Sequence, residues 1–426
     1  MTVRELEVSL DGVLCGILSQ DTNGNLQFVY DDEYRRLPDA TPLSLSIPLS
    51  AARHKKRVVL PYLQGLLPDN HEALNAIARR FSVSANNPFA VIEHVGADVA
   101  GAVQVVHPGA PVPDRDRSRT RARALDENDV ADMLTRVVQE YEEGAPYYDA
   151  IGRFSLAGAQ PKIALHSLDD GRWAVPEDAV PTTHILKPVV RAFRRIDVVE
   201  WMTMRAAARL GNEVASSDLV EVGPWHVFVS ARYDREKRAG RWRRLHQEDL
   251  CQALAVPPAK KYQHSDGGPG TAAIGQLLSH LPIDSNRRDV SERFFRAFVF
   301  NVVAGCTDAH AKNYSLLLSG RSVRMAPLYD LASYAAYWDG ESRLESAMSV
   351  GGEYSLAKIS GKDLITEGRR FGLEQNAAGE IVEAARTGML DAFESALAEL
   401  EVFGREAVSM GDELVRGIRM LPLVQR

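Results

Sequence analysis

Apolar and polar residues alternate along the first part of the chain, the spacing expected of strands whose two faces meet different surroundings. Two extended runs within residues 5–30 are separated by an Asn-Gly dipeptide, which is typical of a tight turn. Residues 66–95 have the pattern of helices, and residues 98–106 again have the composition of a strand. The pattern therefore predicts an N-terminal region that combines strands and helices.

A second group of short extended segments begins after residue 151. One helix is predicted among them, and it is followed by Gly211, in a position where glycine commonly ends a helix. We expect strands at residues 162–166, 173–175, 183–187, 218–222 and 226–231, and the helix at residues 198–210. This order predicts a small sheet with a helix packed on it.

After Tyr233 the pattern becomes mainly helical. Residues 291–304 place aromatic and aliphatic side chains at helical spacing, which indicates a buried helix. Apolar residues also recur every three or four positions over residues 390–400. The sequence thus predicts an α+β fold with a cleft between a sheet-rich lobe and a helical lobe.

The composition is that of an ordinary globular protein, and it bears on the cellular compartment in which the protein is expected. Of the 426 residues 45% are hydrophobic, and the net charge of −7 argues against binding nucleic acid through bulk charge, although a local basic face stays open. The three cysteines are far apart, so neither a disulfide framework nor a zinc site is indicated. No signal peptide is recognised, and no stretch approaches the roughly 18 apolar residues of a membrane span. We expect a cytoplasmic protein without a membrane partner.

The segment GCTDAHAKNYSLLL, residues 305–318, has the strongest chemical signal. It places Asp308 five residues before Asn313, the spacing of protein-kinase catalytic loops. A carboxylate there can accept the proton of an attacking hydroxyl, an amide oxygen can bind Mg²⁺, and Lys312 can neutralise charge on the γ-phosphate. Asp330 stands where kinases place a second metal ligand, although the Phe-Gly of their DFG motif is absent. Taken alone, each feature also occurs in ordinary loops and turns.

Upstream segments supply candidates for a nucleotide site. Lys187 ends an apolar strand, where a buried ammonium group needs anionic partners such as the phosphates of ATP. Glu200 on the next helix could hold this amine, or could equally be a surface glutamate. Small residues at 157–159 precede the strand of Lys162, so their main chain could approach phosphates. Ser155, immediately before this loop, could itself accept a phosphate.

Other groups of residues admit alternatives to a catalytic role. His310 lies close to Asp308 and could form a metal pair, but the spacing of the remaining histidines favours packing or a supporting role. No GxSxG motif supports a Ser-His-Asp hydrolase. Two basic runs, at residues 115–123 and 235–244, could contact nucleic acid, and solvated surface is the simpler interpretation of both.

Several segments resemble the signature sequences of the HipA-type toxin kinases. They are FSLAGAQPKIAL, THILKP, LHQEDLCQALAVPPAKKYQHSDGGPG, GCTDAHAKN and PLYD, and near the N-terminus TPLSLSIPL and GLLPDN. The resemblance extends from about residue 5 to about residue 400. It implies a bilobal protein-kinase-like fold with an added N-terminal α/β subdomain and a mostly helical C-terminal lobe. The domains would span residues 1–125, 126–233 and 234–426.

The resemblance also implies roles for individual residues. Asp308 would be the general base, with Lys312 beside it, and Ser155 resembles the serine whose autophosphorylation inactivates these kinases. The ATP site would comprise Ala157, Gly158, Ala159, Gln160, Pro161, Lys162, Lys187, Ala231, Arg232, Tyr233, His310, Asn313, Tyr329 and Asp330. Of these, Asn313 and Asp330 would hold Mg²⁺, and Ala231 to Tyr233 would form the hinge against adenine.

This chain departs from the family pattern at two positions. Pro161 stands where a polar residue is common and can stiffen the loop, and Ala231 stands where the hinge commonly has glutamate. Neither change removes a group that the chemistry needs. Glu200 is predicted to form the supporting ion pair with Lys187.

The family implies a serine/threonine protein kinase toxin that transfers the γ-phosphate of ATP to a protein. The first candidate acceptor is an aminoacyl-tRNA synthetase of the glutamyl type, whose loss would halt translation and cause dormancy. A small helix-turn-helix antitoxin of the HipB type would join the toxin in repressing the operon through operator DNA. Two other interpretations stay open: a catalytically silent kinase-like module that bridges antitoxin and DNA, and a small-molecule kinase with the same ATP site. The joint presence of Asp308, Asn313, Asp330 and Lys187 favours the active protein kinase.

Overall fold

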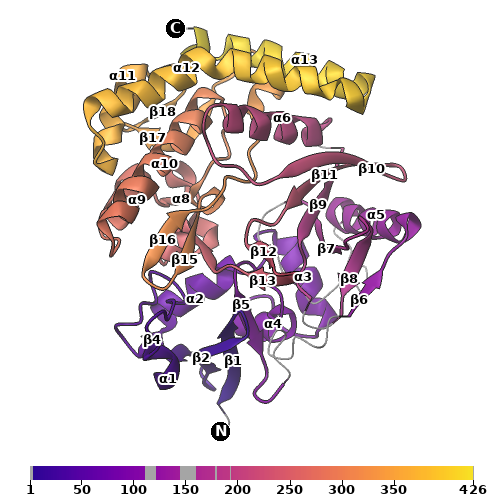
Figure 1. Ribbon diagram of the computed structural model, residues 1–426, viewed down its shortest axis with the longest axis vertical. Helices are drawn as coiled ribbons and strands as arrows, with labels where there is room; N and C mark the ends of the chain where they lie inside the picture. The colour runs from indigo at the N-terminus through magenta and orange to yellow at the C-terminus, as the bar shows by residue number, and fades with distance from the viewer. Residues whose placement is uncertain (1–2, 111–120, 144–159, 178–179, 192, 426) are drawn as a thin grey trace. The chain divides into compact units, whose positions relative to one another are not determined.

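The computed structural model describes residues 3–110, 121–143, 160–177, 180–191 and 193–425. The chain divides into two compact units, whose elements are drawn in Figure 1. Unit 1 comprises Met1–Pro188, Glu221–Ala259 and Leu317–Arg321, and unit 2 comprises Val189–Val220, Lys260–Leu316 and Ser322–Arg426. Each unit is therefore assembled from segments that are distant in the sequence.

Unit 1 begins with an antiparallel sheet of order β4-β3-β2-β1-β5. Its strands are β1 (Arg4–Leu10), β2 (Val13–Gln20), β3 (Leu26–Tyr30), β4 (Arg53–Lys55) and β5 (Val103–Val106). Residues 5–30 form three strands where the sequence predicts a pair, because Asp11 and Gly12 both adopt positive φ and add a second hairpin turn. The strand predicted at 98–106 is shorter than expected, since Gly101 has φ +77° and the chain turns there before β5.

Short helices pack on this first sheet. They are α1 (Asp32–Arg35), α2 (Lys56–Gly65), α3 (His71–Arg80) and α4 (Pro88–Val95). The helical region predicted at 66–95 contains α3 and α4 as separate helices, because the side chains of Asn70 and Asn87 each accept hydrogen bonds from main-chain N–H groups of the turn that follows. The apolar core between helices and sheet includes Phe28, Tyr62 and Phe89.

A second antiparallel sheet in unit 1 has the order β11-β9-β7-β8-β6. Its strands are β6 (Ala122–Ala124), β7 (Ile163–Ser167), β8 (Trp173–Pro176), β9 (His184–Pro188) and β11 (Trp225–Ala231). Helix α5 (Glu127–Glu143) packs on β7, and the indole N–H of Trp225 donates to Thr135 Oγ1 of α5 at 3.0 Å. All five strands predicted from residue 151 onward are present within a residue or two of their expected bounds, four of them in this list and the fifth as β10 (Ser217–Val222).

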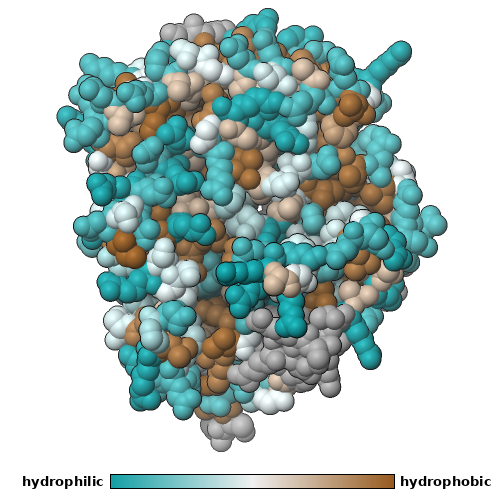
Figure 2. Space-filling view, in the orientation of Figure 1, coloured by the Kyte–Doolittle hydropathy of each residue, from teal (hydrophilic) through white to brown (hydrophobic). Residues whose placement is uncertain are grey.

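The remaining elements of unit 1 follow β11. A basic hairpin, β12 (Arg235–Arg238) and β13 (Arg241–Arg244), leads to β14 (Gln247–Asp249) and α7 (Leu250–Ala253). Figure 1 labels β12 and β13, and Figure 2 shows hydrophilic side chains in the same region of the view. Strands β10 (Ser217–Val222) and β15 (Ser315–Ser319) and the single turn η1 (Pro258–Lys260) continue from one unit into the other.

Unit 2 is mainly helical. Its helices are α6 (Ile196–Arg209), α8 (Gln263–Asp266), α9 (Thr271–Ser279), α10 (Asp284–Val303), α11 (Gly361–Glu367), α12 (Gln375–Ala398), α13 (Arg405–Met420) and α14 (Pro422–Gln425). Shorter 3₁₀ turns are η2 (Ala311–Asn313), η3 (Tyr334–Tyr337), η4 (Gly368–Phe371) and η5 (Glu399–Phe403), and the strands are β16 (Ser322–Met325), β17 (Glu345–Val350) and β18 (Glu353–Ser355). Within the described ranges no helix is both long and apolar enough to cross a membrane.

The core of unit 2 is built on α10, which contains all of the predicted buried helix at 291–304 except its last residue. Phe294 is fully buried, and its ring centroid lies 4.9 Å from that of Tyr314 and 5.1 Å from that of Phe371. Helix α12 packs against α6, α10 and α13. On the face shown in Figure 2, the region of α12 and α13 is mainly hydrophilic, as expected of helices that bury one side only. Unit 2 thus gives a rigid base to the loop that follows α10.

A buried carboxyl group joins two distant segments of unit 1. Glu248 lies 2.5 Å from Ser44 Oγ through one oxygen, and its other oxygen accepts a hydrogen bond from the main-chain N–H of Leu45 at 2.8 Å. Burial penalises the charged form and raises the pKa of Glu248 from 4.5 to about 8, although both hydrogen bonds oppose the shift. Glu248 is therefore mainly neutral in the folded protein at pH 7.

This pKa makes stability depend on pH in a defined window. The folded-state pKa lies above the unfolded-state value, so the stability that Glu248 contributes is complete below about pH 4.5 and is lost as the pH rises toward 8. In the wild type the free energy of unfolding should fall by on the order of a few kcal/mol across this window. We expect Glu248→Gln, which keeps the shape of the protonated form, to remove this fall. Urea unfolding at several pH values measures it, and equal slopes in both proteins would contradict a buried neutral Glu248.

Candidate active site

The loop predicted to carry the chemistry follows α10 and is fixed at the point where that helix ends. The main-chain N–H of Cys306 donates to Asn301 O at 2.9 Å, and Ser333 Oγ donates to Ala304 O at 2.6 Å. Gly305 has φ +66°, a conformation that side-chain-bearing residues rarely adopt. Because these contacts all lie inside unit 2, the loop starts from a single, well-packed position.

Asp308 organises this loop through its main chain. Its carbonyl oxygen accepts hydrogen bonds from the His310 N–H at 2.8 Å and from Asn313 Nδ2 at 3.0 Å. The predicted base and the predicted metal ligand, five residues apart, are thereby joined. The Asp308 side chain is exposed, and one of its carboxylate oxygens accepts a hydrogen bond from the Tyr262 hydroxyl.

Tyr262 was not predicted to belong to the site from its side chain or its position in the sequence. It lies directly before α8, and its ring meets the ring of His310 edge to face, with centroids 4.9 Å apart. The signal was present, because Tyr262 belongs to the PPAKKYQHSDGGPG segment of the family resemblance. Sequence separation alone gave no reason to bring it to Asp308.

A second acidic position is tied to the same loop by Tyr329. The Tyr329 hydroxyl donates to Lys312 O at 2.8 Å and lies 2.7 Å from Ser315 Oγ. Asp330 follows directly and has φ +57°, in the left-handed region that costs energy for most residues and is best tolerated by Asp, Asn and Gly. Such strain clusters at functional sites. The sequence places Asp330 seventeen residues after Asn313, and the fold brings its neighbour into contact with the loop.

The arrangement around the loop suits a hydrated divalent cation. Asn313 Nδ2 donates to Asp308 O, so the side-chain oxygen of Asn313 points the other way. An amide oxygen is a ligand that Mg²⁺ accepts. Asp330 supplies a carboxylate. The described residues contain no cluster of three or more His, Cys, Asp or Glu side chains that could hold a metal, so phosphate oxygens and water would supply most ligands.

The other predicted positions of unit 2 are buried. Lys312 and His310 are each about 5% exposed or less, and Glu200 lies inside α6. The chain just after Asp330 approaches this helix, because the main-chain N–H of Ser333 donates to Thr203 Oγ1 at 3.2 Å. Lys187, the expected partner of Glu200, belongs to unit 1, and the ion pair stays a prediction.

The predicted nucleotide-binding residues of unit 1 lie on its second sheet. Lys187 is half-buried at the end of β9, with its Nζ 5.4 Å from the centroid of the Phe228 ring on β11. Of the small-residue loop, Gln160, Pro161 and Lys162 are described and directly precede β7. Ala157, Gly158, Ala159 and the proposed phosphate acceptor Ser155 lie outside the described residues.

Main-chain and side-chain contacts hold the predicted hinge residues inside unit 1. Ala231, the last residue of β11, pairs with His184 on β9, and the Arg232 N–H donates to Thr183 O at 2.8 Å. The Arg232 guanidinium forms a fork with Asp234, and the Tyr233 hydroxyl donates to Gln247 Oε1 at 2.8 Å. A nucleotide contact in this segment would therefore fall to its main chain.

Two family models match the chain over most of its length. The HipA N-terminal domain matches residues 6–106, and the HipA-like C-terminal domain matches residues 154–393. The second match covers the loop of Asp308, Asp330 and all the described residues of the predicted nucleotide site.

Individual relatives agree with the family models. The serine/threonine-protein kinase toxin HipA of Shewanella oneidensis is 30% identical over 87% of this chain and 84% of its own length. Y4mE of Sinorhizobium fredii is 35% identical over 94% of this chain and 92% of its own length. The solved HipA of Shewanella oneidensis MR-1, in a complex with HipB and operator DNA, has a TM-score of 0.78 at 26% identity and covers 97% of this chain and 96% of that chain.

These matches confirm three predictions from the sequence: the family resemblance, the α+β class and the kinase activity. They extend across both units and include the loop whose geometry the structure shows. This chain belongs to the HipA family of serine/threonine-protein kinase toxins.

Proposed function

We propose that this kinase transfers the γ-phosphate of ATP to a serine or threonine hydroxyl, with Asp308 as the general base. The observation that carries the proposal is the closed loop in which Asp308 O holds Asn313 while Tyr329 holds Lys312. Three groups that phosphoryl transfer needs, a base, a cation and an amide oxygen, are thereby fixed on one short segment.

The chemistry follows from what each side chain offers. The exposed carboxylate of Asp308 accepts the proton of the attacking hydroxyl as its oxygen bonds to phosphorus and the bond to the leaving diphosphate breaks. Lys312 offsets negative charge on the transferred phosphoryl group. Asn313 and Asp330 would hold Mg²⁺, which when bound neutralises charge on the β- and γ-phosphates. The Tyr262 hydroxyl donates to one carboxylate oxygen of Asp308.

The family pattern assigns the contacts with the nucleotide. Lys187 would pair with its phosphates, supported by Glu200, and the segment Ala157 to Lys162 would cover them with main-chain N–H groups. The main chain of Ala231 to Tyr233 would contact adenine. Pro161 is buried and would restrict the mobility of the phosphate-covering loop.

The partners are inferred from the relatives. The solved Shewanella HipA was crystallised with HipB and operator DNA, which supports a HipB-type antitoxin and repression of the operon through the joint complex. We propose a protein acceptor, with a glutamyl-type aminoacyl-tRNA synthetase as the first candidate, in the cytoplasm. Its phosphorylation would stop translation and lead to dormancy.

Removal of the base separates an active kinase from a silent binding module. We expect Asp308→Ala to lower the rate of γ-phosphate transfer from labelled ATP by at least about a hundredfold, because general-base catalysis is worth roughly 10²–10⁴ in rate. Asp391→Ala, an exposed aspartate on α12, is the matched control and should retain full activity. Transfer that persists in Asp308→Ala would exclude Asp308 as the base. Absence of transfer in the wild type, despite ATP binding, would favour the binding module.

Substitutions at Asp330 separate its backbone conformation from its chemistry. Asn tolerates positive φ better than Ala, so Asp330→Ala should lower the free energy of unfolding by about 1 kcal/mol relative to Asp330→Asn. Both variants should lose phosphate transfer, since neither has a carboxylate. Urea unfolding and the labelled-ATP assay give the two values. Activity in Asp330→Asn at ordinary Mg²⁺ concentration would show that the carboxylate is dispensable.

Autophosphorylation can be tested at a single position. We expect Ser155→Ala to abolish self-labelling while transfer to a protein acceptor continues, and therefore to prolong growth arrest after induction. Mass spectrometry of the wild type incubated with ATP and Mg²⁺ locates the phosphate. A phosphate on another residue, with none on Ser155, would refute the assignment.

A further inference from the structure

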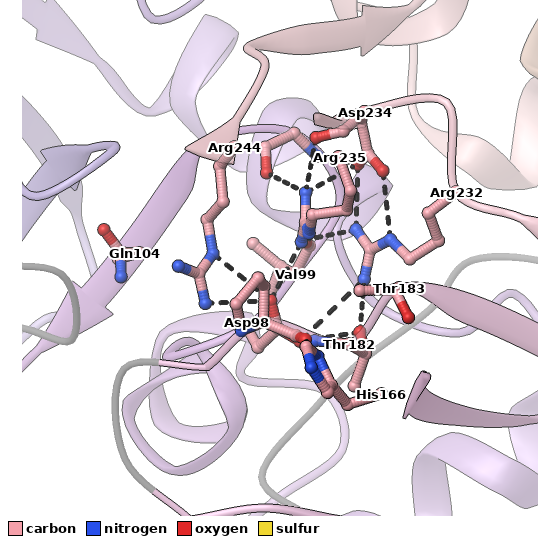
Figure 3. A network of polar contacts seen from close by, with 12 residues as sticks. Asp98, Val99, Gln104, His166, Thr182, Thr183, Arg232, Asp234, Arg235 and Arg244 are labelled. Carbon is pink, nitrogen blue, oxygen red and sulfur yellow. Dashed lines mark hydrogen bonds and ion pairs between the residues drawn. The ribbon is translucent and has the colours of Figure 1, made fainter. Parts of the chain in front are cut away.

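A buried cluster of charged residues in unit 1 lies outside the catalytic groups. We call it the Asp98 cluster: Asp98, Thr182, Arg232, Asp234, Arg235 and Arg244 (Figure 3). Asp98 follows α4 in the region matched by the HipA N-terminal domain, and the other members lie in the region matched by the C-terminal domain. The cluster therefore joins the two family domains within one compact unit.

Asp98 contacts groups from three directions. Its Oδ2 accepts hydrogen bonds from the main-chain N–H of Thr182 at 3.0 Å and from Thr182 Oγ1 at 2.7 Å. Its Oδ1 accepts from the Arg235 guanidinium at 2.8 Å and lies 3.3 Å from Arg244 Nη2. This one carboxylate thus fixes the entrance of β9 and both ends of the β12–β13 hairpin (Figure 3).

Arg232 is the member that belongs to the predicted hinge. Its guanidinium donates to both oxygens of Asp234 at 3.0 and 2.8 Å, to Thr182 Oγ1 at 2.8 Å and to Val99 O at 2.9 Å. Thr182 Oγ1 therefore accepts from Arg232 and donates to Asp98, so it links the hinge side chain to the N-terminal domain. These contacts hold the side chain away from a nucleotide role of its own.

The main chain of the hinge is held at the same place. The Arg232 N–H donates to Thr183 O, next to the Thr182 that contacts Asp98. Asp234, just after the hinge, accepts from the Gly101 N–H at 2.7 Å. A Cβ on Gly101 would approach main-chain atoms of Gln247 to 3.0 Å, so the chain packs closely there. Backbone and side chain of the hinge thus depend on the same loop after α4.

Asp98 and Arg235 are both charged at neutral pH. Burial alone would raise the pKa of Asp98, but Arg235, Arg244 and Arg232 outweigh it and hold that pKa well below its usual range. Burial and the neighbouring Arg232 lower the pKa of Arg235 to about 10, which still leaves it protonated. Buried ion clusters add little net stability compared with packed apolar side chains, and their best-attested value is a defined geometry. The segment that this cluster contacts directly is the hinge, through Arg232.

We propose that Asp98 and Thr182 are positioning residues for the nucleotide-contacting segment Ala231–Tyr233, so that the N-terminal domain forms part of the ATP site. The inference rests on the proposed function, because it takes this segment as the contact for adenine. Loss of the Thr182 hydroxyl would remove the link between the Arg232 side chain and Asp98 and shift the main chain of the hinge. The consequence is weaker nucleotide binding, without loss of any group that acts in phosphate transfer.

The test compares two substitutions at one position. Thr182→Val removes the hydroxyl with little change of shape, and Thr182→Ser keeps it. We expect Thr182→Val to raise the Kd for a non-hydrolysable ATP analogue with Mg²⁺ about tenfold, a loss of uniform binding that raises KM and changes kcat by less than about twofold. Thr182→Ser should bind as the wild type does. Calorimetry on the full chain gives the Kd, and the rate of self-labelling against ATP concentration gives KM and kcat.

Val91→Ala controls for a general loss of stability. Val91 is fully buried on α4 in the apolar core, and the substitution leaves a cavity in the same domain. Unchanged Kd in Thr182→Val, or an equal loss of affinity in Val91→Ala, would overturn the proposal. If the wild type itself fails to bind the analogue, the proposed function fails with it.

A measurement on the wild type covers the case in which Thr182→Val does not fold. Hydrogen exchange with and without the analogue should show slower exchange at Ala231–Tyr233 and at the loop of residues 98–101 together. Protection of the hinge without any change in that loop would overturn the proposal.

Discussion

The hydrogen bonds to the main-chain oxygen of Asp308 are the constraint on which the catalytic half of this kinase depends. The donors are the His310 N–H and Asn313 Nδ2, and together they close a six-residue loop on itself. These hydrogen bonds use the carbonyl oxygen and not the carboxylate, so the side chain of Asp308, the proposed base, stays exposed while the main chain around it is fixed. Tyr329 then ties Lys312 and Ser315 to the strained residue Asp330.

The two units achieve order at their functional segments by different means. In unit 2 an apolar core around Phe294 carries the loop, and neutral hydrogen bonds set its shape. In unit 1 the hinge is set by buried charges, with Asp98 and Asp234 compensating three arginines (Figure 3). Apolar packing tolerates small shifts of position, whereas a bidentate ion pair fixes both distance and angle. A hinge that contacts a nucleotide through its main chain benefits from the second kind of restraint.

Much of the fold was predictable because its signals are local. Periodicity found α6, α10 and most strands of the second sheet, and the Asn-Gly turn found one hairpin. The errors have local causes too: the turn with positive φ at Asp11 and Gly12 adds a third strand, and the turn at Gly101 shortens β5. In the site, chain spacing named Asp308, Asn313 and Asp330, but the Asp308–Tyr262 contact spans 46 residues and leaves no periodic trace. The basic run at 235–244 was likewise ambiguous, since Arg235 and Arg244 are buried on Asp98 while Arg238 and Arg241 are exposed.

The sequence by itself determined the elements, the order of the kinase-like motifs and the family, because each depends on residue types at short and fixed spacings. Only the tertiary structure decided which distant groups meet: Tyr262 with Asp308, Glu248 with Ser44, and Asp98 with the arginines that follow β11. The physical reason is that burial and electrostatic pairing depend on distance in space. The same arginine is a solvated surface residue or the anchor of a hinge according to which carboxylate the fold places beside it.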